Sequence, residues 1–435
     1  IKNFVMNDIE LALNARAKEN IIDPTLDRIE LLVDALGSPQ LSYPTIHIGG
    51  TNGKTSTSRI TDTLLFAMGL RTGRFTSPHL EDFRERICIN GKPISQEELD
   101  FTYNDIKAYF DFVDGKSKQP LSYFEIVTAL AFAAFAEHPV DIGIFEVGMG
   151  GEWDATNVVK PDVAVITPIG LDHQEFLGKE ILQIAETKAG ILKPDSIAVL
   201  AEQEPEVAKL LLRKAAENGM DVARAGLDFE IMQRQIAVGG QLLTIRGTKD
   251  VYSDLFLPLH GKHQAQNAAL ALVAAEAFFG DKELDHEAVR EGFANASSPG
   301  RLEVVKREPT VILDAAHNTH GARALANALQ EEFNFDQTIG VVGVFQDKDG
   351  AGILLELEPV LDSVIITQSN SERAMPADQL ASIARKIFGA ERVYVESDLK
   401  KAIAKATATN PLSDDTVGIV ITGSVTTVGQ ARSLI

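Results

Sequence analysis

Short apolar runs rich in β-branched residues alternate with longer helical stretches along most of the chain. Two of these runs, Asp141–Val147 and Val163–Thr167, are apolar on both faces, and Thr45–Ile48 is also expected to be a strand. A strand that reads this way is buried on both faces, which is typical of parallel sheets covered by helices. A helix is expected at Lys54–Met68 and another at Phe124–Ala136. The pattern therefore predicts an α/β protein built on parallel sheets.

The chain of 435 residues is long enough for two or three domains. After an alternating segment at Phe229–Ile245, expected to be a hairpin, and an Ala-rich helix at Gln264–Phe279, the turn-forming stretch 295–300 marks a boundary. We predict a P-loop NTPase-like parallel-sheet domain over residues 1–296 and a smaller, Rossmann-like domain over 297–435. The strands expected in the second domain are Val311–Asp314, Ile339–Phe345, Val364–Thr367, Val393–Val395 and Gly418–Ile421.

Composition limits the partners and the compartment. The formal net charge of −21 disfavours nucleic acid and anionic membranes as partners. The single cysteine, Cys88, excludes an intrachain disulfide and fits a reducing cytoplasm. Ile1–Glu10 lacks the pattern of a signal peptide, and the longest apolar run, Ala129–Ala136, is too short to span a membrane. We therefore expect a cytoplasmic protein.

The glycine-rich stretch 49–56 is the strongest local signal for function. It reads Gly-Gly-Thr-Asn-Gly-Lys-Thr-Ser and lies between an expected strand and an expected helix. Backbone N–H groups at such a helix start hold phosphates. Lys54 would reach the outer phosphates and Thr55 would offer a hydroxyl to Mg²⁺. Only three residues separate Gly49 from Gly53, one fewer than in the common phosphate loop. The context nevertheless predicts a nucleotide site, without distinguishing a kinase, an ATPase or a ligase.

Polar residues at two further strand ends extend this site. Glu146 ends a buried strand ahead of a glycine-rich turn, and Asp172-His173 follows the next strand. The carboxyl ends of parallel strands face the ligand crevice, so Glu146 and His173 are candidate metal ligands. The glycines of that turn would let the backbone approach a ligand closely. Lys188 is expected about four turns along a following helical segment, where apolar neighbours suggest burial and therefore a need for an anion or for chemical conversion to one.

Taken together and in order, these motifs resemble those of one superfamily, the Mur ligases. The shared motifs are Gly50–Thr55, Glu146–Gly148, Asp172-His173, Lys188–Gly190 and Asp314–Asn318. Three more motifs resemble the branch of folylpolyglutamate and dihydrofolate synthases: Thr76–Leu80, Ser122–Glu125 and Asp154–Asn157. The resemblance runs from about Pro44 to Gly429.

The resemblance implies that the cofactors are ATP and Mg²⁺, with two Mg²⁺ sites. It also implies roles for particular residues. Gly53, Lys54, Thr55 and Ser56 would hold the ATP phosphates, and Asn267, Arg301 and Asp314 would contact the nucleotide. Ser77, Glu146 and His173 would bind Mg²⁺ together with Thr55. Lys188 would be carbamylated and would bind the second ion. Lys54, Lys188, Arg301 and His317 would act in catalysis, with His317 as a candidate general base.

The resemblance also implies one substrate site for a folate or dihydropteroate and another for L-glutamate. Members of the family are commonly monomers, so a monomer is expected. The pterin wall would comprise Ser122, Tyr123, Phe124, Glu125, Trp153, Asp154 and Ala155. The glutamate site would draw on Arg86, Lys348, Ser424 and His317. The chain departs from the family at Glu152, where an arginine usually follows the paired glycines, and at Thr55, where many members have glycine.

The activity implied is ATP-dependent addition of glutamate to a carboxylate through an acyl phosphate, as tetrahydrofolate synthase, dihydrofolate synthase or both. Two alternatives remain open at this point. A Mur ligase acting on peptidoglycan precursors shares the chemistry but would lack the motifs around Ser77 and Tyr123. A nucleotide-hydrolysing regulatory protein would need neither a carboxylate site nor the second domain.

Overall fold

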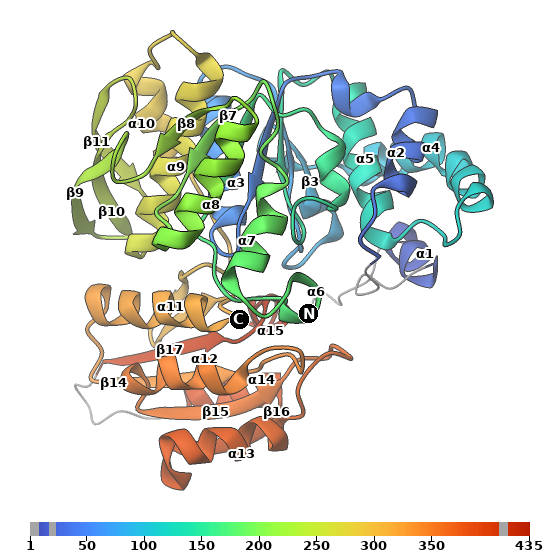
Figure 1. The fold of residues 1–435 in the computed structure, drawn as a ribbon. Helices are drawn as coiled ribbons and strands as arrows, with labels where there is room; N and C mark the ends of the chain where they lie inside the picture. Colours follow the sequence, from blue (N-terminus) through green and yellow to red (C-terminus); the bar gives the residue numbers. More distant parts are fainter. Residues whose placement is uncertain (1–7, 17–22, 409–415) are drawn as a thin grey trace.

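The computed structural model describes residues 8–16, 23–408 and 416–435. Two α/β units lie one above the other, and the chain passes from the larger to the smaller between Ala294, where the last helix of the larger unit ends, and Glu303, where the first strand of the smaller unit begins (Figure 1). Most of Ile1–Glu10, on which the expectation about a signal peptide rests, lies outside the described residues. In the part of the chain that is described, no helix is long and apolar enough to cross a bilayer.

The larger unit is organised around an eight-stranded sheet. Its six central strands are parallel, and a short antiparallel hairpin closes one edge. In spatial order the strands are β4 (Lys92–Pro93), β3 (Ile87–Ile89), β2 (Thr72–Phe75), β5 (Ile142–Glu146), β1 (Thr45–Gly49), β6 (Val163–Ile166), β7 (Ile197–Leu200) and β8 (Asp221–Arg224). Because the middle strands carry apolar side chains on both faces, helices must cover both sides.

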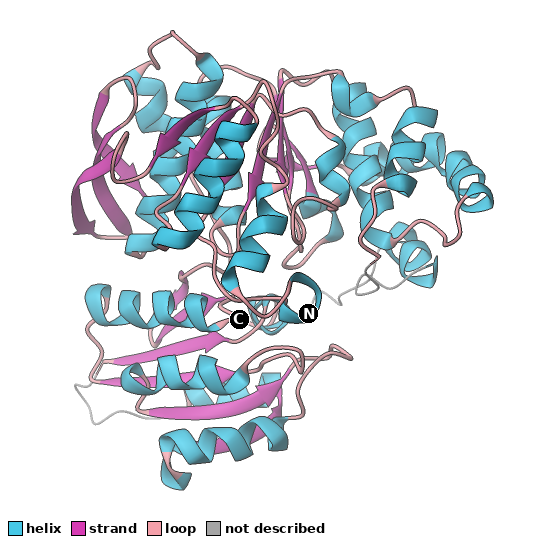
Figure 2. Ribbon diagram, in the orientation of Figure 1, coloured by secondary structure: helices cyan, strands magenta, loops and turns pink. Residues whose placement is uncertain are grey.

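Helices form a layer on each face of this sheet (Figure 2). One face packs against α3 (Lys54–Ala67), α9 (Lys262–Phe279) and α10 (His286–Ala294). On the other face, one half is covered by α7 (Ile181–Ala189) and α8 (Pro205–Glu217). The helices over the remaining half are α1 (Asp8–Arg16), α2 (Asp27–Ala35), α4 (Gln96–Lys116) and α5 (Tyr123–Glu137). A further helix, α6 (Gln174–Leu177), lies at the junction with the smaller unit.

A separate antiparallel sheet packs beside α9. Its strands are β9 (Glu230–Ala237), β10 (Gly240–Arg246) and β11 (Val251–Leu257). The hairpin predicted at Phe229–Ile245 is therefore confirmed, with its turn at Gly239, where φ is +80°. The third strand was not predicted from the sequence.

The smaller unit is a six-stranded sheet, parallel except at one edge. The strands in spatial order are β12 (Glu303–Arg307), β13 (Thr310–Asp314), β17 (Val417–Thr422), β14 (Gln337–Val342), β15 (Ser363–Gln368) and β16 (Val393–Asp398). One face is covered by α11 (Thr319–Glu332), α12 (Gly350–Leu357) and α13 (Ala377–Phe388), and the other by α14 (Leu399–Thr407) and α15 (Val425–Arg432). All five strands expected here are present, although β14 ends at Val342 and not at Phe345.

The α/β fold class is confirmed, and the carboxyl ends of β1, β5 and β6 lie side by side in register. Ile48 of β1 is opposite Glu146 of β5 and Val165 of β6. The loops that follow these three strands therefore meet at one edge of the sheet, facing the smaller unit.

Candidate active site

The glycine-rich loop between β1 and α3 has a conformation that only glycine accommodates at two positions. Gly50 and Gly53 have φ values of +138° and +92°. A Cβ atom on Gly50 would lie 2.0 Å from the Thr167 hydroxyl, and one on Gly53 would lie 2.4 Å from the Asn267 amide oxygen. The two glycines thus allow the loop to turn tightly into α3, whose first residue is Lys54.

Lys54 folds back over this loop. Its ammonium group donates hydrogen bonds to the carbonyls of Gly50 and Thr51, each over 3.2 Å. Burial lowers the pKa of Lys54, while the negative charge of Glu146 opposes that shift. A half-buried cation that donates to two neutral carbonyls is well suited to receive an anionic ligand.

Glu146 lies at the end of β5, as predicted, and is buried. The Thr55 hydroxyl donates to one of its carboxylate oxygens over 2.7 Å, and the backbone N–H of Ser77 points at the other over 3.3 Å. Burial raises the pKa of Glu146, and Lys54 partly offsets this effect. Two predicted metal-site residues, Thr55 and Ser77, therefore contact the carboxylate of a third, Glu146.

Asp172 ties the two units together. Its carboxylate accepts hydrogen bonds from Lys348 and from the Asn318 side chain (3.0 Å), and the His317 ring lies 3.4 Å away. Burial opposes ionisation of Asp172, but the hydrogen bond and charge of His317 and the charge of Lys348 outweigh it. The pKa of Asp172 is consequently held far below its usual range. Burial lowers the pKa of the adjacent His173 to about 3, so its ring is neutral at pH 7.

Lys188 is buried, and its ammonium donates to the Gly50 carbonyl over 2.7 Å. Burial lowers its pKa to about 7, and it has no carboxylate partner among the described residues. Its predicted position four turns along one helix is wrong. Gly178, at φ +103°, separates α6 from α7, and Lys188 lies in the last turn of the nine-residue α7.

The paired glycines before Glu152 bring the end of α7 against the loop after β5. A Cβ atom on Gly151 would lie 2.9 Å from the Lys188 carbonyl oxygen, and one on Gly190 would lie 2.5 Å from the Glu152 Cα. Gly151 therefore allows close packing against the backbone of Lys188. From the sequence we had expected the glycines of this turn to let the backbone approach a ligand. The Glu152 side chain is exposed, and its backbone N–H donates to the Thr187 carbonyl over 2.8 Å.

The smaller unit contributes Arg301, Asp314 and His317 to the opposite wall. The buried Asp314 carboxylate accepts backbone N–H groups from Leu302 and Ala316, each over 2.8 Å. It thereby fixes the two loops that carry Arg301 and His317. Burial raises the pKa of Asp314, and the charge of Arg301 counteracts that shift.

These groups line one cavity of about 430 Å³ between the units. Twelve predicted residues contribute to it: Gly53, Lys54, Thr55, Ser56, Ser77, Glu146, His173, Lys188, Asn267, Arg301, Asp314 and His317. Sequence reasoning did not assign roles to Asn52 or His263, which also line the cavity. The side chain of Asn52 exchanges hydrogen bonds of 3.2 and 3.1 Å with that of Asn318 across the two units. The available signal was their place in the sequence: Asn52 lies within the recognised motif Gly50–Thr55, and His263 lies four residues before Asn267.

The remaining predicted residues do not line this cavity in the described structure. Ser122 and Glu125 form a capping box at the start of α5, and Glu125 also pairs with buried Arg28 over 3.1 Å. Arg86 donates to His79 over 2.9 Å and lies 5.4 Å from the centre of the Tyr123 ring. Their substrate-binding roles stay predictions.

Several of these residues lie directly behind the cavity wall. Phe124 packs against Gly148, and the Asp154 carboxylate accepts the backbone N–H of Met149 over 2.8 Å. Gly148 and Met149 themselves line the cavity. Trp153 covers Gly150, and Ala155 is buried beside it in the chain. In the smaller unit, Lys348 is engaged by Asp172 and Ser424 caps α15 through the Thr427 N–H (3.0 Å).

The oxygen donors around Glu146 fit a hard divalent cation better than a softer one. Among the described residues, no three His, Cys, Asp or Glu side chains gather closely enough to hold a metal ion. A metal here would therefore rely on hydroxyl groups and on ligand oxygens as well as on Glu146.

A phosphate loop at the edge of one parallel sheet, faced across a cavity by a second α/β unit, defines a two-domain nucleotide-dependent enzyme. Two family models match the chain: the Mur ligase middle domain over residues 48–275 and the Mur ligase glutamate ligase domain over residues 300–425.

Comparison with individual proteins identifies the branch of the Mur ligase family to which the chain is most similar among these matches. The chain is 50% identical to the dihydrofolate synthase/folylpolyglutamate synthase of Mycobacterium tuberculosis, covering 98% of this chain and 93% of the relative. The solved structure of M. tuberculosis folylpolyglutamate synthase complexed with ADP superposes with a TM-score of 0.94, covering 98% of this chain and 97% of that one. Escherichia coli FolC in complex with DHPP and ADP gives a TM-score of 0.85 at 29% identity, with coverage of 98% and 96%.

The chain belongs to the dihydrofolate synthase/folylpolyglutamate synthase family of Mur ligases. The resemblance inferred from the sequence motifs is thereby confirmed, and with it the ligase class. The peptidoglycan-precursor and regulatory alternatives are set aside.

Because Asp172 neutralises the buried Lys348, we predict that removing its charge destabilises the folded protein. Asp172→Asn would leave Lys348, whose side chain is only 6% exposed, without a counter-charge. We expect the free energy of unfolding in a urea titration at pH 7 to fall by about 3 kcal/mol. Because the pKa of Asp172 is depressed, this difference should persist above about pH 4 and shrink only as the pH falls further.

Asp228→Asn is the matched control, since Asp228 forms an exposed ion pair with Arg224 over 2.9 Å. Its loss should cost less than about 1 kcal/mol. Equal effects of the two substitutions would show that Asp172 does not hold the units together.

Proposed function

We propose that this cavity joins the amine of L-glutamate to the carboxylate of a folate or of dihydropteroate, with ATP as the activating substrate. The observation that carries the proposal is the convergence of Lys54, Glu146, Lys188 and Arg301, from both units, on a single cavity. ADP and DHPP in the E. coli FolC structure support the same pair of ligands for this chain.

In this proposal the phosphates of ATP occupy the loop between β1 and α3. Backbone N–H groups from Gly53 to Ser56 and the Lys54 ammonium hold them, because the helix start offers unpaired donors and a favourable dipole. Asn267 contacts the nucleotide from α9, and Arg301 and Asp314 contact it from the smaller unit.

Two Mg²⁺ sites complete the proposed nucleotide site. Thr55, Ser77, Glu146 and the neutral ring of His173 would hold the first ion. A carbamate on Lys188 would convert a buried cation into an oxygen ligand for the second ion. When bound, Mg²⁺ neutralises negative charge on the phosphates and on the transferring group.

The proposed chemistry has two balanced steps. A carboxylate oxygen of the folate substrate attacks the γ-phosphorus of ATP, the bond to the β–γ bridging oxygen breaks, and ADP leaves. The glutamate amine then attacks the acyl carbon, and phosphate departs with the former carboxylate oxygen. Lys54 and Arg301 stabilise the charge on the transferring phosphoryl group. The amine must lose a proton, and His317 is the candidate base.

The substrates would approach from the wall behind Gly148 and Met149. The pterin would contact the α5 start, Ser122–Glu125, together with Trp153, Asp154 and Ala155. Glutamate would be bound by Arg86, Lys348 and Ser424, with the smaller unit closing over it. Closure matters because an acyl phosphate is hydrolysed where water has access.

We also propose the boundary between residues 296 and 297 as the hinge between two domains, 1–296 and 297–435. The separate sheets on either side of this point support it. The proposal further takes the enzyme to be a cytoplasmic monomer, in keeping with its single cysteine, Cys88.

Product analysis tests the proposal directly. The chain is mixed with ATP, glutamate and either dihydropteroate or tetrahydrofolate, and glutamylated products are measured by mass spectrometry. We expect product in the wild type and at least about a 1,000-fold lower rate for Lys54→Ala, since Lys54 supplies charge to the phosphoryl group. Lys209→Ala, an exposed lysine on α8, is the control and should keep wild-type activity. Unimpaired turnover by Lys54→Ala would refute the role of the loop.

The carbamate on Lys188 has a spectroscopic test. After incubation with ¹³C-labelled bicarbonate, the wild type should show a carbamate carbon resonance that Lys188→Arg lacks. Burial of the amine, which donates a hydrogen bond to the neutral Gly50 carbonyl, favours the uncharged form that reacts with CO₂. Identical spectra for the two proteins would rule out the modification.

A further inference from the structure

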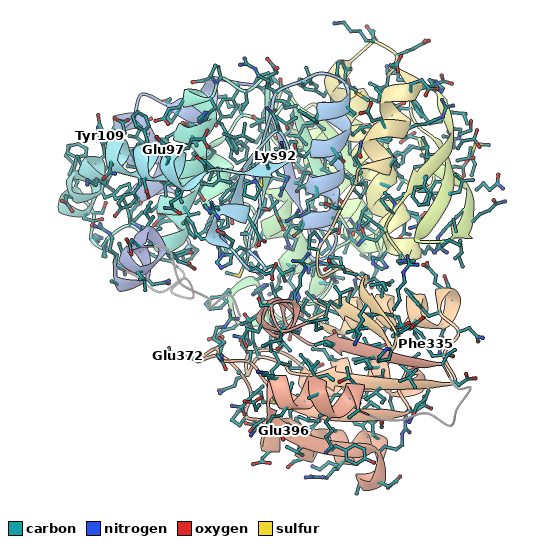
Figure 3. All side chains as sticks on the ribbon, turned by 180° about the vertical axis from the view of Figure 1, so that it is seen from behind. Lys92, Glu97, Tyr109, Phe335, Glu372 and Glu396 are labelled. Atoms are coloured by element: carbon teal, nitrogen blue, oxygen red, sulfur yellow. The ribbon has the colours of Figure 1, made fainter. Side chains whose placement is uncertain are left out.

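A second cavity, of about 190 Å³, lies between the two units away from the nucleotide loop. Both units line it, through residues Arg59, Arg74, Leu80, Glu81, Glu85, Cys88, Gly91, Pro93, Pro299 and Arg432. The β3–β4 hairpin that bears Gly91 and Pro93 lies on the rear face of the larger unit, where Lys92 is labelled (Figure 3). Within the described residues, this lining has no member in common with the catalytic cavity.

Arg59 is the unusual member of the lining. It lies on α3 and is half-buried. Its guanidinium group carries five N–H donors, yet no side chain or carbonyl among the described residues accepts a hydrogen bond from it or pairs with its charge. A partly buried guanidinium normally has an anionic or hydrogen-bonding partner.

The neighbouring acids are already engaged. Asp62 pairs with buried Arg74 over 2.8 Å. The Glu85 carboxylate accepts three backbone N–H groups, those of residues 80–82, at 2.9–3.0 Å. Glu81 and Glu303 both pair with Arg432. Asp62, Glu81 and Glu303 therefore neutralise other guanidinium groups, and backbone N–H groups hold the Glu85 carboxylate, so none of these acids forms an ion pair with Arg59.

Arg59 keeps its positive charge at pH 7 despite being partly buried. Burial and, to a smaller extent, the charge of Arg74 lower the pKa of Arg59 to about 10, against the opposing influence of Cys88 and Glu85. A pKa near 10 leaves the group protonated at pH 7. The cavity thus contains a charged fork of donors beside a second guanidinium group.

We propose that this second cavity binds a small oxyanion, a phosphate or a carboxylate, on the guanidinium of Arg59. The planar fork of an arginine matches the oxygens of either group in a bidentate manner. Two sources are present in the reaction mixture of this family: phosphate, which the reaction releases, and the carboxylates of glutamate.

The position of the cavity gives such an anion a means to influence catalysis. Leu80 packs against Gly300 and Gly429 of the smaller unit. Along the chain, Ser77 lies three residues before Leu80, and Arg301 lies two residues after Pro299; both Ser77 and Arg301 line the catalytic cavity. An anion on Arg59 would lie between the segment that bears Leu80, in the larger unit, and the segment that bears Pro299, in the smaller unit. It would thereby favour the closed arrangement of the two units.

Calorimetric titration of the full chain tests the site. AMPPCP is kept at saturation so that the nucleotide loop is filled, and sodium phosphate or sodium glutamate is added at constant ionic strength set with sodium chloride. Binding is compared among the wild type, Arg59→Gln, Arg59→Lys and the control Arg213→Gln, which alters an exposed arginine of α8.

We expect a binding event that Arg59→Gln weakens about tenfold or more and that Arg213→Gln leaves unchanged. Arg59→Lys should weaken binding less than Arg59→Gln does, because lysine keeps the positive charge but lacks the bidentate fork. If only phosphate shows this dependence, the reaction product is the ligand; if glutamate shows it, the substrate is. An equal affinity of wild type and Arg59→Gln for both anions overturns the proposal.

A second measurement decides the matter if Arg59→Gln does not fold. Wild-type crystals containing AMPPCP are soaked in sodium selenate, whose selenium scatters anomalously. An anomalous peak at the Arg59 guanidinium supports the site, and its absence contradicts it. Neither experiment depends on ligase turnover, so the result is independent of the proposed function.

Discussion

The shape of the catalytic cavity depends on how a single carboxylate, that of Asp172, is shared between the two units. Lys348, Asn318 and His317 approach it from the smaller unit, and the neighbouring His173 belongs to the larger one. Ionised Asp172 neutralises the buried Lys348 and at the same time holds the start of α11 against the phosphate loop. Without that contact, the walls bearing Lys54 and Arg301 would have fewer restraints on their separation.

A second constraint lies within the larger unit, where backbone atoms rather than side chains set the spacing. The Gly50 carbonyl accepts hydrogen bonds from both Lys54 and Lys188. Gly151, packed against the backbone of Lys188, holds the end of α7 at the distance that this contact requires. Two ammonium groups are thereby held beside the glycine loop, where a highly charged nucleotide would stabilise both.

Much of this arrangement was predictable from the sequence because it follows from periodicity and from strand ends. The runs at Asp141 and Val163 could be recognised as buried strands, so Glu146, Asp172 and His173 could be assigned to one edge of the sheet. The hairpin near Gly239 and the helix at Gln264–Phe279 were likewise recognised from local pattern. Motif order then identified the family, which the comparisons confirmed.

Features that depend on contacts between distant segments were not predictable in the same way. Gly178 interrupts the helical segment before Lys188, although a single glycine does not by itself determine whether a helix ends. The partner of Glu125 is Arg28, 97 residues away, and the partner of Lys348 is Asp172, 176 residues away. The isolation of Arg59 is likewise a property of the packed structure, since it depends on which acids other groups have already engaged.

The most direct test of the central claim follows an oxygen atom through the reaction. Dihydropteroate labelled with ¹⁸O in its carboxylate is mixed with ATP, glutamate and the wild-type chain, and the released phosphate is analysed by mass spectrometry. Formation of an acyl phosphate in this cavity predicts that each phosphate carries one carboxylate oxygen from the substrate. Phosphate without label, released together with glutamylated product, would contradict the mechanism.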